Sequence, residues 1–149
     1  MGSRLLPLAA LLVLAGCGSS GSGEHAAWPG PPKPSADGHF AVSGFNDFLA
    51  GDGKEFARSP IAAVTEFLRL DESTASVITV RSTSPGEVRN FADVVATLDG
   101  LLDDSVRAAR YTVELQRNDA NEWRLRAADW AKKCQPGRGH QDFSLGPCV

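Results

Sequence analysis

The stretch that decides the fold lies near the C-terminus and reads Ala109-Arg-Tyr-Thr-Val-Glu-Leu-Gln116, then Trp123-Arg-Leu-Arg-Ala127. In both halves every second residue is apolar and the residues between are polar. Because successive side chains of a β-strand point to opposite faces, this alternation predicts two strands with one buried and one exposed face. The polar run from Asn118 to Asn121 between them predicts a hairpin loop.

The second strand of this hairpin contains one irregularity. Trp123, Leu125 and Ala127 share the buried face, but Trp130 falls on the opposite parity. One extra residue in a strand restores the parity of everything that follows it. We therefore expect a β-bulge near Ala128–Asp129.

The outer face of the hairpin carries arginines. Arg110, Arg124 and Arg126 alternate with the apolar residues, and Glu114 and nearby aspartates lie among them. A row of this kind can bind an anionic partner, or it can be a solvated face whose charges are neutralised locally. The neighbouring acidic residues favour the solvated face.

Segments upstream of the hairpin predict helices followed by strands. Apolar residues at helical spacing predict a short helix at Phe45–Leu49 and a second helix that begins after Ser59 and finishes near Asp71. β-Branched residues predict a strand over Ser76–Thr83. Residues 88–102 fit both a helical and a strand period, and we interpret them as a strand because strands surround them.

This order of elements predicts an α+β layer fold. Over residues 59–130 it resembles the NTF2-like and cystatin-like arrangement, carried by the helix Ser59-Pro60 to Phe67-Leu68 and by the strand from Trp123 to Trp130. The resemblance implies N-terminal helices packed on a curved antiparallel sheet of three to four strands.

Length and charge limit the possible functions. A chain of 149 residues suits one domain and is too short for a TIM barrel or a full Rossmann enzyme. The formal net charge of −3 argues against a nucleic-acid partner, since such proteins usually carry a basic excess.

The N-terminus carries an export signal. Leu5 to Ala15 is apolar and too short to cross a bilayer as a helix. It ends in Leu14-Ala-Gly-Cys17, which resembles the lipobox of bacterial lipoprotein precursors. The resemblance implies that residues 1–16 are a signal peptide, that the thiol of Cys17 receives lipid, and that the protein lies on the extracytoplasmic side of the cell membrane. The alternative is an ordinary secretory signal with a chance cysteine.

Between Cys17 and the domain the composition changes. Residues 18–39 are rich in Gly, Ser and Pro and have no regular apolar pattern. Such a sequence predicts a flexible linker. Trp28 within it could insert at the membrane interface or dock on the domain, and an incidental aromatic residue is favoured over both. The folded domain is then expected to occupy residues 40–149.

The C-terminal tail contains the other two cysteines, Cys134 and Cys148. If Cys17 carries lipid, an even pair remains in an exported protein, which predicts a disulfide between them. Two free thiols or a bridge between molecules are the alternatives.

The tail also holds the candidate binding residues Arg138, His140 and Asp142, which alternate and would point to one side of an extended segment. They could bind an anion or act as an acid–base set, but a structural role within the loop is favoured over both. The sequence offers no catalytic constellation, no set of metal ligands and no cofactor motif.

Two functional hypotheses follow. The first, which we favour, is a non-enzymatic envelope lipoprotein whose domain binds an envelope protein or a small ligand. The second is a small NTF2-like enzyme that uses a pocket residue such as His140 as its acid or base. Cystatin-like protease inhibition is a third possibility that rests on fold analogy alone.

Overall fold

The computed structural model of the chain describes residues 26–83 and 90–149. It confirms an α+β fold in which helices precede an antiparallel sheet. The elements are, in chain order, α1 (Ser43–Ala50), η1 (Phe56–Arg58), α2 (Pro60–Phe67), η2 (Leu70–Glu72), β1 (Val77–Thr83), β2 (Phe91–Asp99), β3 (Val106–Arg117) and β4 (Trp123–Cys134).

The sheet is an open meander in which the four strands lie in the order β1-β2-β3-β4 and every neighbouring pair is antiparallel. The interpretation of residues 88–102 as a strand is confirmed by β2. Its even-numbered residues from Ala92 to Leu98 are buried, and the residues between are only partly covered. This strict alternation arises because β2 lies between two other strands and has helices on one face only.

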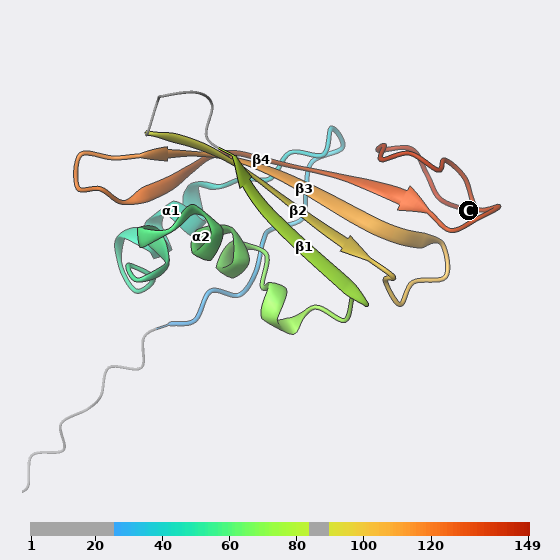
Figure 1. The fold of residues 1–149 in the computed structure, drawn as a ribbon, viewed down its shortest axis with the longest axis horizontal. Coiled ribbons are helices and arrows are strands. Elements are labelled where there is room, and N and C mark those ends of the chain that lie inside the picture. Colours follow the sequence, from blue (N-terminus) through green and yellow to red (C-terminus); the bar gives the residue numbers. More distant parts are fainter. Residues whose placement is uncertain (1–25, 84–89) are drawn as a thin grey trace, which may run out of the picture.

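The hydrophobic core lies between the helices and one face of the sheet (Figure 1). Phe45 and Leu49 of α1 and Phe67 of α2 are fully buried there. The sheet contributes its inward-facing residues, among them Val94, Val113, Leu115 and Leu125. The opposite face of the sheet carries no helix in the described part of the chain, and we call it the open face.

Helix α2 begins as expected and ends earlier than expected. The hydroxyl of Ser59 accepts a hydrogen bond from the backbone N–H of Ala62 at 3.4 Å and caps the helix. The helix was expected to reach Asp71, but it ends at Phe67 because Arg69 adopts a left-handed conformation with φ of 49°. A left-handed residue cannot continue an α-helix, and the chain goes on as the short 3-10 helix η2.

The expected β-bulge is present, two residues earlier than expected. Leu115 of β3 pairs with Leu125, and Glu114 pairs with Ala127, so Arg126 is the extra residue. Beyond it the parity of β4 changes, and Ala128, not Ala127, is buried in the core. The bulge therefore turns the second half of β4 so that Trp130 lies on the helix side of the sheet.

The assignment of residues 26–39 to a flexible linker needs correction. The indole N–H of Trp28 donates to the backbone oxygen of Phe67 at 3.0 Å, and its ring lies 4.9 Å from that of Phe45. Trp28 is thus part of the aromatic core, not an incidental residue. Composition alone missed this because one aromatic anchor can hold a segment that has no periodic pattern.

The same segment also extends the sheet. The N–H of Phe40 donates to the oxygen of Ala128 at 2.8 Å, and the N–H of Trp130 donates to the oxygen of Gly38 at 3.0 Å. The outer edge of β4 is thereby covered, whereas the outer edge of β1 has no backbone partner among the described residues. An added Cβ at Gly38 would meet the oxygen of Trp130 at 2.8 Å, so this close approach requires glycine.

The predicted signal peptide and Cys17 lie outside the described residues. Within residues 26–83 and 90–149, no helix has the length and apolar character needed to cross a membrane.

Candidate functional site

The C-terminal tail forms a closed loop. Cys134, the last residue of β4, is bonded to Cys148, which confirms the predicted disulfide. The N–H of Cys134 also donates to the oxygen of His140 at 3.0 Å, and the N–H of Val149 donates to the oxygen of Arg138 at 2.7 Å. We call residues 134–148 the cysteine loop; it lies at the opposite end of β4 from the β3–β4 turn (Figure 1).

A short antiparallel bridge holds the cysteine loop against the sheet. The backbone groups of Lys132 and Ser144 exchange two hydrogen bonds, of 3.0 and 2.9 Å. Gly139 lies so close to the disulfide that an added Cβ would meet the sulfur of Cys134 at 2.9 Å. The loop is therefore a fixed extension of the sheet.

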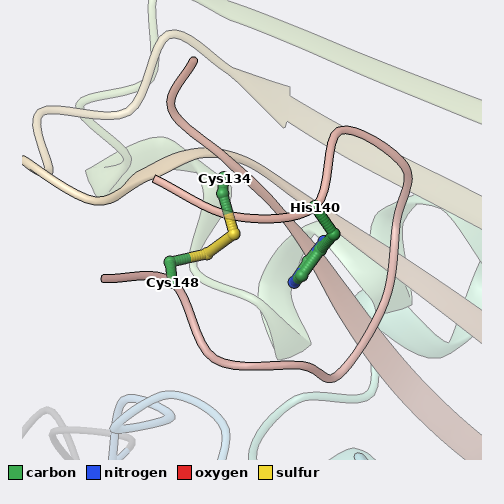
Figure 2. Close-up of side chains that lie close together, drawn as sticks. All are labelled: Cys134, His140 and Cys148. Atoms are coloured by element: carbon green, nitrogen blue, oxygen red, sulfur yellow. A yellow bond between two sulfur atoms is a disulfide. The ribbon is translucent and has the colours of Figure 1, made fainter. Parts of the chain in front are cut away.

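His140 lies inside the loop beside the disulfide (Figure 2). Its Nδ1 lies 2.8 Å from the backbone oxygen of Asp142, and its Nε2 lies 2.9 Å from that of Gly146. Both partners are carbonyl acceptors, so only the protonated ring, with N–H on both nitrogens, donates to both. These two bonds, first to Gly146 and then to Asp142, raise the pKa of His140. When it is protonated, the ring thus cross-links two turns of the loop.

The three candidate binding residues of the loop do not converge on one point. The guanidinium of Arg138 donates to the oxygen of Val149 at 3.3 Å, and Asp142 contributes its backbone oxygen to His140. No ion pair joins Arg138 to Asp142 in the described structure. In this arrangement the three residues serve the loop's own backbone, and binding of a ligand by them stays a prediction.

The loop also brings together atoms that resemble a set of metal ligands. The two sulfurs and a ring nitrogen of His140 lie within 4.8 Å of one another. The sulfurs, however, are bonded to each other, and both ring nitrogens have carbonyl partners. The oxidised loop therefore has no free donor among these atoms.

A second candidate site lies on the open face. Side chains of β1, β2 and β3 surround a hollow of about 470 Å³. Its lining residues are Thr79, Arg81, Val95, Thr97, Arg110 and Thr112. This volume is within the range of small-molecule sites, roughly 300–1,000 Å³.

The hollow is basic. No carboxylate belongs to its lining, and neither Arg81 nor Arg110 forms an ion pair in the described part of the chain. The guanidinium of Arg110 lies over the ring of Phe143, 3.8 Å from its centroid. Stacking of this kind fixes the plane of the guanidinium and leaves its N–H groups free at the edge.

The other arginines of the outer face lie outside the hollow. Arg124 pairs with Glu122 at 2.7 Å, and Arg126 lies over the ring of Phe91 at 5.5 Å. The expected neutralisation by Glu114 is not seen, since that carboxylate makes no ion pair among the described residues. Sequence analysis placed Arg110 on the outer face correctly and missed Arg81; the alternation of Thr79, Arg81 and Thr83 along β1 was the signal that could have found it.

An apolar hollow of about 320 Å³ lies on the helix side, where the segment around Pro31–Pro34 crosses the sheet. Phe40, Tyr111 and Trp130 line it, and burial raises the pKa of Tyr111. It lacks the pair of cations that distinguishes the open face.

The open-face hollow therefore combines space, hydroxyl groups and two arginines that have no acidic partner in the described part of the chain. The polar groups of the cysteine loop, in contrast, hydrogen-bond to the loop itself. His140 is not among the residues that line the hollow. The chain matches no protein-family model, no curated protein and no solved structure.

Proposed function

We propose that this protein is a lipoprotein of the bacterial envelope, held on the extracytoplasmic side of the membrane by lipid on Cys17, and that its domain is a non-enzymatic binding module. The sequence from Leu14 to Cys17 supports the anchor. The disulfide supports the compartment, because such bonds persist in oxidising environments outside the cytoplasm.

The length of the tether places the domain near the bilayer. Trp28 belongs to the core, and the described chain begins at residue 26. Only residues 18–25 separate the lipid from the fold, and a stretch of this length spans at most ~30 Å. The domain would therefore remain within reach of membrane-bound partners and of ligands at the membrane surface.

The position of Trp28 also orients the domain. Trp28 packs against Phe45 and Phe48 of α1 and Phe67 of α2, on the side of the sheet opposite to the open face. The tether would thus leave from the helix side and direct the open face away from its point of attachment. The hollow on that face, whose two arginines form no ion pair within residues 26–83 and 90–149, is the observation that carries the binding function.

The fold family is part of the same proposal. Two helices followed by an antiparallel meander have the element order of NTF2-like and cystatin-like folds. An enzyme using His140 is less well supported, because both nitrogens of that ring have partners within the loop.

Replacing the anchor residue tests the proposal. We expect C17A to abolish incorporation of labelled fatty acid and to move the protein out of the membrane fraction, because the acyl chains supply the anchor. The control is C148S, which removes a cysteine from the tail and should retain the label. Unchanged labelling of C17A would contradict the proposal.

A further inference from the structure

We propose that the hollow on the open face binds the phosphate group of a small soluble phosphate monoester. This inference rests on the proposed binding function and names the ligand class of the same surface. Its evidence is the register of the strands, the chemistry of the lining side chains and the fixed position of Arg110.

The strand register places the two arginines on either side of β2. Arg81 of β1 is paired with Val95, and Arg110 of β3 is paired with Thr97, two residues along β2. Neighbouring strands are ~4.8 Å apart and a strand rises ~3.3 Å per residue, so the backbones of the two arginines lie roughly 12 Å apart, diagonally across the middle strand. The two cationic side chains therefore flank β2 and can approach one group bound above it.

Threonine hydroxyls complete the lining. One cross-strand row contains Thr79, Thr97 and Arg110, and the next row contains Arg81, Val95 and Thr112. Each row thus contains one arginine and at least one threonine hydroxyl. The two arginines lie on opposite edges of the hollow, Arg81 on β1 and Arg110 on β3. A hydroxyl both donates and accepts, so it can bind phosphate oxygens and the hydroxyls of the attached molecule.

The number of donors favours phosphate over carboxylate. A carboxylate has two oxygens and satisfies one guanidinium fork. A phosphate monoester carries a charge of about −1.5 to −2 at neutral pH and three strong acceptor oxygens. Two arginines and three threonines in one lining match the larger charge and the larger number of acceptors.

The cysteine loop holds Arg110 in place. Phe143, whose ring supports the guanidinium, lies beside Ser144, which is bridged to Lys132 of β4. The disulfide closes the loop around both residues. The loop that sequence analysis singled out would then serve the site as a positioning element and not as a ligand-binding element.

The acidic groups nearest to the hollow do not neutralise it. Asp93 and Glu114 face each other one row beyond Arg81. Asp129 lies opposite Thr112, but its carboxylate is hydrogen-bonded to Nδ1 of His39. Asp99 binds Arg107 at 3.3 Å, at the other end of the strands. Among the described residues, the two arginines of the hollow therefore have no carboxylate partner.

The experiment titrates the protein, purified in a neutral detergent, with inorganic phosphate and with phenyl phosphate. We expect amide chemical shifts to move around residues 79–81, 95–97 and 110–112. R81Q and R110Q should each raise the dissociation constant tenfold or more, the usual effect of losing a charge-assisted hydrogen bond. F143A, which keeps both arginines, should raise it by a smaller factor.

The matched control is R126Q, which removes the same charge from the same face outside the hollow and should change the affinity little. An equal loss in R126Q, acetate binding as tight as phosphate, or no binding of either phosphate probe would overturn the proposal. Binding to phosphatidylglycerol vesicles without binding of phenyl phosphate would assign the site to lipid headgroups and also overturn it. None of these outcomes affects fatty-acid labelling at Cys17, so the two proposals fail separately.

Discussion

At the scale of single residues, the protonation of His140 determines how many hydrogen bonds its ring donates within the cysteine loop. The backbone oxygens of Asp142 and Gly146 lie within hydrogen-bonding distance of the two nitrogens of one ring. A neutral imidazole has a single N–H and can donate to only one of them. Both bonds therefore hold the loop only when the ring is protonated.

This arrangement predicts a pH-dependent stability. The hydrogen bonds to Gly146 and Asp142 raise the pKa of His140 above its ordinary value of 6.5; the carboxylate of Asp142 also raises it, and Lys132 lowers it. A raised pKa in the folded state means that the ring's contribution is complete below pH ~6.5 and is lost as the pH rises through the folded-state pKa. The difference in melting temperature between wild type and H140A should be largest in mild acid and should shrink at alkaline pH. A difference that is constant with pH would contradict this role.

Trp28 leads to a second prediction at this scale. W28A should lower the free energy of unfolding by an amount near the low end of ~3–5 kcal/mol, because it removes a large partly buried ring from the core. W28F should cost only about 1 kcal/mol, through loss of the bond to Phe67. Urea denaturation measures both, and K33A, an exposed change in the same segment, is the control. If W28A were as stable as wild type, residues 26–39 would not belong to the folded domain.

At the scale of elements, β4 owes its geometry to one residue. Arg126 has no partner on β3, and its presence changes which side chains of β4 face the helices. Trp123 and Leu125 of the first half are buried. In the second half Ala128 is buried and the backbone N–H of Trp130 donates a hydrogen bond to the oxygen of Gly38. Before the bulge the odd-numbered residues of β4 face the helices, and after it the even-numbered residues do.

Deleting Arg126 should therefore leave both halves of β4 facing as they do now. The pairs on either side of it, Leu115–Leu125 and Glu114–Ala127, would follow one another directly, and Ala128 would stay opposite Val113 on the helix side. The deletion and R126A should both cost only about 0.5–1 kcal/mol, through loss of the contact with Phe91. Guanidinium denaturation of both variants checks the prediction. A deletion that costs more than ~3 kcal/mol would contradict it and show that the fold depends on the bulge itself.

The same elements show what could be derived from the sequence. The alternation of apolar and polar residues predicted β3, β4 and the bulge. Residues 88–102 fitted both a helix and a strand, and the strands expected on either side of them led to the correct choice of a strand for β2. The left-handed turn at Arg69 was not predictable, because no glycine or asparagine marks it. The hollow was also beyond reach: it depends on the register between β1, β2 and β3, and the sequence alone does not fix which residues lie opposite one another.

At the scale of the whole molecule, the segment before α1 and the C-terminal tail are both hydrogen-bonded to the outer edge of β4. Residues 38–40 cover one part of this edge, and Ser144 bridges to another. The disulfide secures the second attachment, and through Phe143 it supports Arg110 on the open face. The fold thus links the C-terminal tail to the candidate binding surface.

Removing the disulfide should test this link. C134A/C148A should lose about 3 kcal/mol of stability, the entropic effect expected for a loop of this size. The tail should then fray and become sensitive to limited proteolysis between residues 136 and 149. Wild-type protein treated in parallel is the control, and a double variant that resists cleavage as well as wild type would contradict the role assigned to the bond.

The central claim, a lipid-anchored envelope protein with an oxidised tail, is tested most directly by the intact mass of the protein extracted from membranes. The account predicts a chain of residues 17–149 that carries a diacylglyceryl group on Cys17 and gains two hydrogens when it is reduced. A mass equal to residues 1–149, or an unmodified chain whose mass does not change on reduction, would contradict it.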